Sequence, residues 1–249
     1  MFASISTSPE SASTTSLNNF IPLNFEALEL GSNFNYRFSP KSSIYSGYRL
    51  SNQTPNVTQL SPFQDVSNPL NIRTGNPDLE PSNNHNLYAG FNAFDFQKGT
   101  GFYSHIGGNL TSNAVVSKST IDENFVRNTT YTNVKGNYNV YGNASFSKSI
   151  KVDSLRTFKY RIGISTNFNK SVNFNNGVQY DSKNTSFSPN AEITFNWKKV
   201  LELRPNYRVS FNNTKFDIDN FNDQKFVTHS LGINTATFLP KKLEWIYYH

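Results

Sequence analysis

Hydrophobic and polar residues alternate with a period of two along most of this chain. The clearest segment runs from Val134 to Ser147, where Val, Tyr, Ala, Phe and Gly residues fall on one parity. Lys135 and a series of Asn and Ser residues fall mainly on the other parity. A period of two places successive side chains on opposite faces of a β-strand. The pattern therefore predicts strands with one apolar and one polar face.

About ten such segments follow one another, which predicts an all-β fold with an antiparallel sheet. The predicted strands cover residues 27–38, 44–50, 87–96, 102–112, 134–147, 158–168, 187–197, 201–211, 227–238 and the residues from 243 onward. Alternation is weak in the second and ninth segments. In the third, Leu87, Ala89 and Phe91 compete for the apolar face with Tyr88, Phe94 and Phe96. Residues 1–22 have no period and predict a loop, and residues 117–124 predict a polar hairpin.

Short and long connections alternate between the predicted strands, and aromatic residues bracket the short ones. These aromatics are Phe38 and Tyr45, Phe96 and Phe102, Phe146 and Phe158, Trp197, and Phe238 and Trp245. In the clearly alternating segments Lys, Arg and Glu lie on the non-aromatic parity. Short turns, long loops and an aromatic girdle are typical of a transmembrane β-barrel with a polar lumen. The pattern therefore predicts an antiparallel transmembrane β-barrel in the outer membrane of a Gram-negative bacterium.

Composition supports sheet structure and excludes several other classes. The chain has 22 Phe and 13 Tyr but only 16% charged residues, a balance that favours pleated sheet. Its net charge of +6 comes from scattered Lys and Arg without a recognition motif, so we expect no nucleic-acid partner. Cysteine is absent, which excludes thiol chemistry. We find neither a long apolar run nor a secretion signal at Met1.

The stretch from Pro55 to Pro81 interrupts the alternation with five prolines. Proline fixes φ and removes a hydrogen-bond donor, so this stretch is neither a helix nor an interior strand. We expect Gly75 to supply a position with positive φ. Residues 51–81 are thus predicted to form a long extracellular loop that joins two adjacent strands of one sheet.

The same stretch resembles the second half of the barrel in TonB-dependent receptors of the Bacteroidetes type. The resemblance rests on the Thr-Pro at 54–55, Gln-Leu-Ser-Pro at 59–62, Asn-Pro-Leu at 68–70 and Gly-Asn-Pro-Asp-Leu-Glu-Pro at 75–81. The matching positions are Pro55, Gln59, Leu60, Pro62, Pro69, Leu70, Gly75, Asn76, Pro77, Leu79 and Pro81.

This resemblance implies an outer-membrane importer whose barrel of roughly 22 strands encloses a plug domain. Such receptors take up a scarce solute, for example a siderophore, cobalamin or a glycan, when the inner-membrane TonB complex pulls on the plug. The implied partners are outer-membrane lipid, the plug, the TonB complex and an unidentified small-molecule or glycan ligand. About ten strands are too few for such a barrel, so we expect residues 1–249 to form a single partial barrel domain, a fragment of a larger one.

Candidate chemistry is sparse, and we expect neither an enzyme nor a cofactor. His85, His105, His229 and His249 lack the spacing of a metal site. Asp217, Asp219 and Asp223 lack the glycine and final glutamate of a calcium loop. The alternation directs seven charged residues toward the lumen, where they contact water and the plug or bind solute directly: Glu29, Arg37, Lys135, Arg161, Glu192, Arg204 and Arg208. The predicted outer loops carry four aromatic residues: Phe63, Phe174, Tyr180 and Phe221. We expect them either to pack the loops or to stack on a ligand.

Two other functions stay open from the residues. One is a barrel without transport activity that serves as an adhesin or scaffold. The other is a soluble all-β binding module such as a lectin. The soluble module would bury a core between two sheets, and it gives no reason for aromatic residues at every short turn.

Overall fold

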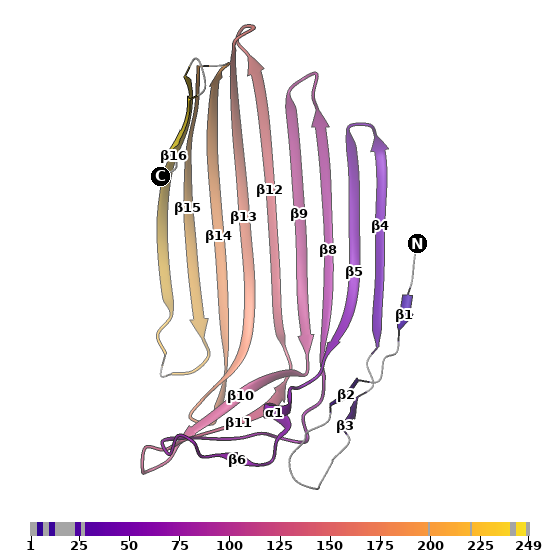
Figure 1. Cartoon of the computed structure of the whole chain (residues 1–249), viewed down its shortest axis with the longest axis vertical. Coiled ribbons are helices and arrows are strands. Elements are labelled where there is room, and N and C mark those ends of the chain that lie inside the picture. Colours follow the sequence, from indigo (N-terminus) through magenta and orange to yellow (C-terminus); the bar gives the residue numbers. More distant parts are fainter. Residues whose placement is uncertain are drawn as a thin grey trace.

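A large antiparallel sheet dominates the computed structural model, which describes residues 4–6, 10–12, 23–25, 28–198, 200–219, 221–239 and 243–247. Eleven strands pair in the order β1-β4-β5-β8-β9-β12-β13-β14-β15-β16-β17 (Figure 1). Their bounds are Ser4–Ser6, Glu29–Ser39, Ser42–Gln53, Ser82–Asp95, Thr100–Ser112, Asn137–Lys151, Arg156–Asn175, Val178–Trp197, Leu201–Phe216, Gln224–Leu239 and Leu243–Tyr247. The all-β antiparallel prediction is confirmed.

A smaller sheet covers one end of the large one. Its strand order is β10-β11-β7-β6, with bounds Ala114–Ile121, Arg127–Val134, Asn71–Thr74 and Gln64–Asp65. The short helix α1 (Val57–Leu60) lies beside it, and β2 (Glu10–Ala12) pairs with β3 (Leu23–Phe25). In Figure 1 these elements gather beyond the lower ends of the long strands, and tight turns join the upper ends. We call these ends the loop end and the turn end.

Register assigns each strand one apolar and one polar face. Leu87 lies opposite Gly108, which lies opposite Val140, and these residues share a face with Phe34 and Ile106. We call this the apolar face and the opposite one the polar face. The large side chains of the apolar face stay open, with Phe34 57% and Ile106 58% exposed. Such a surface cannot face water over eleven strands.

No core lies between two stacked sheets in the described part of the chain. The buried hydrophobic residues there are Leu60, Leu79, Ala114, Val134 and Val172, and all of them lie at the loop end. The soluble all-β alternative requires a core between two sheets, so the structure argues against it. A membrane-spanning helix is not found in the part of the chain that the structure describes.

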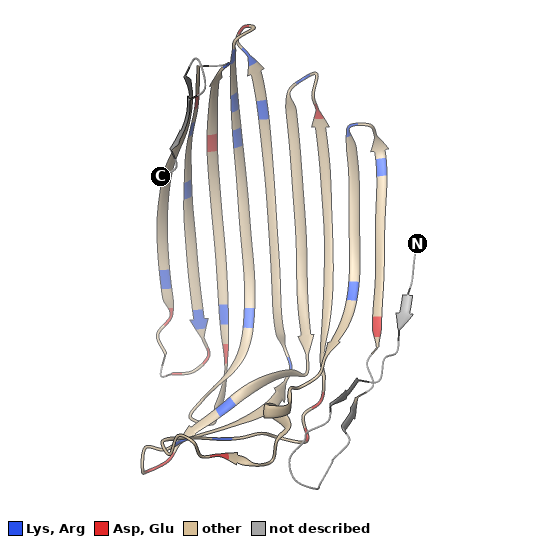
Figure 2. Ribbon diagram, viewed as in Figure 1, with Lys and Arg blue, Asp and Glu red and all other residues tan. Residues whose placement is uncertain are grey.

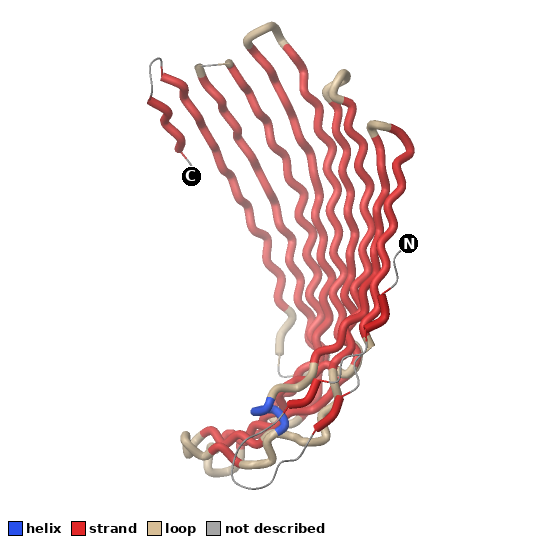
Figure 3. The backbone as a smooth tube through the Cα atoms, turned by 45° about the vertical axis from the view of Figure 1, so that its right-hand side comes forward, coloured by secondary structure: helices blue, strands red, loops and turns tan. Residues whose placement is uncertain are grey.

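The large sheet is curved but does not close among the described strands. In Figure 3 the strands from β4 to β9 overlap nearly edge-on, and those from β13 to β16 spread apart, so the sheet bends across its width. Within the described residues, β1 pairs only with β4, and β17 pairs only with β16. The arrangement is that of an incomplete barrel.

Several predicted boundaries were wrong. The strands β13 and β14 each have 20 residues and extend far beyond the predicted segments toward the loop end. The predicted strand 134–147 is divided, because Val134 ends β11 and Gly136 adopts a φ of +98° before β12 begins at Asn137. Lys135 therefore lies in a bend. The predicted hairpin 117–124 is mostly strand β10, and the chain turns later, at residues 122–126.

The predicted N-terminal loop contains two short strands among its described residues, β1 and β2. The other residues of 1–22 lie outside the described part of the chain. At the turn end, tilted aromatic pairs lie on the apolar face, with ring centroids 6.0 Å apart for Phe91 and Phe102 and 6.3 Å apart for Phe146 and Tyr160. They form the predicted aromatic band. Tyr45 does not belong to this band, because it pairs with Gly90 on the polar face. The side chains of Phe238 and Trp245 lie outside the described residues.

Candidate functional site

The stretch from Pro55 to Pro81 folds into an ordered cap at the loop end. It joins β5 to β8, which pair along their whole lengths as predicted. Within it, Asn56 and Gln59 form a capping box that begins α1, with two hydrogen bonds of 2.9 Å. The side chains of Leu60 and Leu79 are each only 3% exposed. These two residues anchor the cap by burial of apolar surface.

Gly75 allows two parts of this stretch to touch. Its backbone passes so close to α1 that a Cβ atom would lie 2.5 Å from the Ser61 carbonyl oxygen and 2.7 Å from that of Gln59. The next residue, Asn76, donates its N–H to the Gln59 carbonyl at 2.6 Å. The prediction of a positive φ at Gly75 was wrong, because the glycines with positive φ among the described residues are Gly99, Gly136 and Gly177. The close approach is what requires glycine here.

Asparagine side chains join the cap to the connection between β9 and β12. Asn76 Nδ2 donates to the Tyr131 carbonyl at 3.0 Å. Asn133 accepts from the Glu80 N–H at 2.9 Å and donates to the carbonyls of Glu80 at 2.9 Å and Asn113 at 2.7 Å. The two long connections thus form one structural unit, in which β7 pairs with β11 in parallel.

The other motif residues divide by burial. Pro55 is buried and Pro81 is half-buried, whereas Pro62, Pro69, Leu70 and Pro77 are exposed. The exposed residues form an outer surface, and Leu70 is 64% exposed. Hydrogen bonds from the Ser67 side chain and N–H hold the pKa of Asp65, in β6, below its usual range.

A cluster of rings occupies the polar face near the N-terminal half of the sheet. We call Tyr45, Tyr88, Tyr103, His105 and Tyr141 the ring cluster. Tyr45 Oη hydrogen-bonds with His105 Nδ1 at 3.2 Å and lies 3.4 Å from Tyr103 Oη. The His105 ring stacks on Tyr88 at 6.2 Å and packs against Tyr141 at 5.7 Å.

Glycines opposite these rings explain why they lie flat on the sheet. A Cβ atom at Gly47 would lie 2.5 Å from Tyr88 Cζ, and one at Gly107 would lie 2.5 Å from Tyr141 Cζ. Covering a strand glycine with a ring from the neighbouring strand compensates for the missing side chain. The cluster was not predicted from the sequence, although Gly and Tyr alternate on the polar parity of these strands.

Six of the seven predicted lumen charges lie on the polar face: Glu29, Arg37, Arg161, Glu192, Arg204 and Arg208. Lys135 is the exception, since it lies in the bend before β12. Arg161 and Glu192 lie directly opposite each other, and Arg204 forms an ion pair with Glu202. Arg49 and Lys159 lie on the same face, which therefore carries an excess of positive charge among Asn, Ser and Thr side chains. Such a surface binds water or another polar surface.

The histidines do not converge on one site. His85 Nδ1 hydrogen-bonds with Tyr48 Oη at 2.8 Å, and His229 Nδ1 with Tyr207 Oη at 2.7 Å. His105 belongs to the ring cluster, and His249 lies outside the described residues. The described part of the chain contains no group of three His, Cys, Asp or Glu residues placed to hold a metal ion.

The predicted loop aromatics mainly pack against one another. Tyr180, Phe216 and Phe221 form a group with ring centroids 5.4 to 6.4 Å apart. Phe174 packs against the buried cluster of Ala114, Val134 and Val172. Phe63 is 74% exposed and is free to contact a partner.

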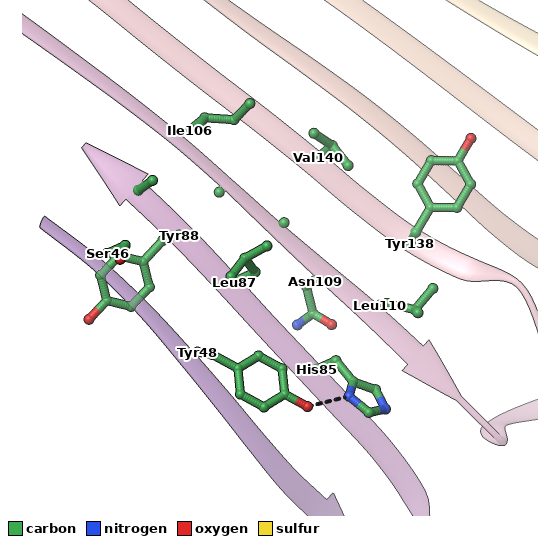
Figure 4. A pocket seen from close by; sticks show the side chains of 13 residues that line it. Ser46, Tyr48, His85, Leu87, Tyr88, Ile106, Asn109, Leu110, Tyr138 and Val140 are labelled. Carbon is green, nitrogen blue, oxygen red and sulfur yellow. Dashed lines mark hydrogen bonds between the residues drawn. The ribbon is translucent and has the colours of Figure 1, made fainter. Parts of the chain in front are cut away.

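A hollow of about 590 Å³ lies on the apolar face rather than on the polar one. Gly108 creates it, because the missing side chain leaves a gap between Leu87 and Val140 (Figure 4). Ile106, Leu110 and Tyr138 complete its walls, and the hydrogen-bonded pair of Tyr48 and His85 borders it. Its apolar lining suits a hydrocarbon chain and separates it from the polar face.

Comparison with known proteins agrees with this geometry. The family model described as "Outer membrane protein beta-barrel family" matches residues 32–244. No curated protein and no solved structure matches the chain. The match covers most of the large sheet and all of the cap. The chain therefore belongs to the outer membrane protein β-barrel family, and it lies in the outer membrane with its apolar face toward lipid and its polar face toward the barrel lumen.

Proposed function

We propose that this chain forms part of the barrel wall of a TonB-dependent receptor. In this proposal the receptor captures a scarce solute outside the cell and releases it inward when the TonB complex acts on a plug domain. The chain itself acts as a wall and a vestibule, without enzymatic activity and without a cofactor.

The observation that carries the proposal is the width of the unclosed polar wall. Eleven strands pair without a return of β17 to β1 among the described residues. Barrels of about eight strands fill their interior with side chains, whereas those of about 22 strands hold a plug. The described sheet suits the wider class, because its eleven paired strands already exceed eight and do not close among the described residues.

The polar face also suits contact with a folded plug. Opposed charges such as Arg161 and Glu192, next to Asn and Ser side chains, offer many hydrogen bonds. The ring cluster adds flat apolar area bordered by hydroxyl groups, a combination that is common in binding surfaces. The cap at the loop end then forms one wall of the entrance.

Uptake measurements in the bacterium that carries the gene test this function. We would delete the gene and follow accumulation of three labelled probes: a ferric siderophore, cyanocobalamin and an oligosaccharide. The deletion should abolish energised accumulation of one probe. A protonophore should reduce wild-type accumulation of the same probe to the same level, because TonB action requires the proton gradient.

A complementing copy of the gene serves as the control and should restore accumulation. Wild-type accumulation of all three probe classes in the deletion strain would contradict the proposal. If that strain also failed to attach to surfaces, the result would favour the adhesin alternative.

A further inference from the structure

Four lysines form a row across adjacent strands on the apolar face. Lys170 of β13 lies opposite Lys183 of β14, and Lys183 lies opposite Lys215 of β15. Lys225 of β16 continues the row. It lies opposite Asn213, the residue two positions before Lys215 on the same face of β15. Figure 2 shows blue bands on these four strands close to their loop ends. We call these residues the lysine row.

The lysine row marks the outer boundary of the apolar band. On the same face and farther from the loop end lie Phe168, Phe187, Phe211 and Val227, each between 43% and 56% exposed. Long loops of outer-membrane barrels face the cell exterior. The lysine row therefore lies at the level of the lipid headgroups in the outer leaflet.

Most of the positive charge in the row is unpaired. Lys170 Nζ lies 2.6 Å from Asp181 Oδ2. In the described part of the chain, Lys183, Lys215 and Lys225 have neither an ion pair nor a side-chain hydrogen bond, and all three are exposed. Two carboxylates share this face, those of Asp181 and Asp217, and the Asp217 carboxylate accepts the Asp181 N–H. The loop that follows β15 carries Asp219 and Asp223, of which Asp223 accepts the Phe216 N–H at 3.3 Å.

Such an arrangement costs stability unless an anion is present. Like charges directly opposite each other on neighbouring strands destabilise a sheet. Here Lys183 and Lys215 form such a pair without a counterion among the described residues, whereas Lys170, opposite Lys183, is already paired with Asp181. A bound anion that contacts several ammonium groups reverses the sign of this interaction.

We propose that the lysine row binds the phosphate groups of a phosphorylated lipid in the outer leaflet. The row faces lipid and borders apolar side chains, so its occupant has both an anionic headgroup and hydrocarbon chains. Four strands at about 4.8 Å spacing place the outermost lysines on the order of 14 Å apart, enough for more than one phosphate. This inference rests on the barrel and its orientation, and it is independent of any transport activity.

Lipid retention by the full-length protein tests the proposal. We would extract the protein from outer membranes with a mild detergent and measure bound lipopolysaccharide by native mass spectrometry. The variant K183Q/K215Q/K225Q should lose bound lipopolysaccharide. Because each basic residue near an anionic surface strengthens binding about fivefold, the affinity for added lipopolysaccharide should fall by on the order of 100-fold.

Two control variants separate charge from folding. K183R/K215R/K225R keeps the charge and should retain the lipid. K98Q/K151Q/K198Q removes three lysines at the turn end, whose side chains make neither an ion pair nor a hydrogen bond among the described residues, and should also retain it. All three variants should migrate as folded barrels in unheated gels.

Three results would overturn the proposal. Equal lipopolysaccharide retention by the triple Gln variant and the turn-end control would show that the lysine row does not bind it. Equal affinity for dephosphorylated lipopolysaccharide would remove the phosphate as the recognised group. Inorganic phosphate that bound as tightly as the lipid would identify a solution anion in its place.

Discussion

Several glycine residues allow other groups to approach the backbone closely. On the polar face they leave space for aromatic rings: the Tyr88 ring lies over Gly47 and the Tyr141 ring lies over Gly107. At the loop end the backbone of Ser61 lies where a side chain at Gly75 would be. A ring can rotate away from an added methyl group, but a backbone that is fixed by hydrogen bonds cannot. The loop glycine is therefore the less replaceable one.

The first prediction concerns G75A. A Cβ atom at this position would overlap the backbone of Gln59 and Ser61, so the cap must separate from α1. We expect the variant to lose about 1–3 kcal/mol of cap stability, the usual cost of overpacking. Cleavage of residues 55–81 by a protease added outside intact cells should accelerate.

G31A is the matched control, because its Cβ would meet only the Tyr48 carbonyl oxygen, at 4.0 Å. Its cleavage rate should stay at that of the wild type. Equal protection of the loop in G75A and the wild type would contradict the role assigned to Gly75.

At the scale of elements, short turns and long connections hold the strands together by different means. The turn between β12 and β13 is closed by one carboxylate, since Asp153 accepts from the N–H groups of Leu155 at 2.8 Å and Arg156 at 2.7 Å. At the loop end, hydrogen bonds to β10 hold the tip of the hairpin formed by β13 and β14. Gly177 donates to the Ser119 carbonyl at 3.0 Å, and Asn176 accepts from the Ile121 N–H at 2.9 Å.

The second prediction is a pH dependence of the turn at Asp153. The Arg156 side chain, followed by the N–H groups of Leu155 and Arg156, lowers the pKa of this carboxyl below its usual value. A group whose pKa is lower in the folded state stabilises that state above the unfolded pKa, and this contribution is lost as pH falls through the folded pKa. The turn should therefore open below about pH 4.

Amide hydrogen exchange at Leu155 and Arg156 checks this expectation. Exchange, corrected for its intrinsic pH dependence, should accelerate as the pH falls below that range. D153N should exchange faster at neutral pH and show no such transition. A transition of the same size in D153N would assign it to another group.

At the scale of the whole molecule, the two faces of the large sheet meet different solvents. The apolar face keeps side chains such as Ile106 and Leu231 more than half exposed, which is stable only against lipid. The polar face carries His105, Asn143 and the other side chains of the lumen. Neighbouring residues along one strand therefore tolerate very different substitutions.

The third prediction compares I106R with N143R. Ile106 lies in the middle of β9 on the lipid side, where an arginine costs about 2–4 kcal/mol. Asn143 lies on the polar side of the neighbouring β12, where the same residue meets water or polar groups. The amount of folded, heat-modifiable protein in the outer membrane should fall for I106R and stay near the wild-type level for N143R. Equal loss in both variants would contradict the assignment of the faces.

The fold class, the approximate strands and the face of most side chains could be predicted from the order of residues alone. Alternation is a local property, so Phe187 and Ser188, or Tyr207 and Arg208, reveal opposite faces without reference to any other strand. The prolines between 55 and 81 likewise marked the long connection through local backbone constraints.

The folded structure was needed for every feature that depends on register between distant strands. It placed Leu87 rather than Tyr88 on the lipid side, moved Tyr45 from the aromatic band to the lumen, and joined β7 to β11 in the cap. It also aligned Lys170, Lys183 and Lys215, which are spread along the sequence, into one row. Pairing of strands brings together residues far apart in the chain, and its register depends on turns and bends such as the one at Gly136, which the period of two does not encode.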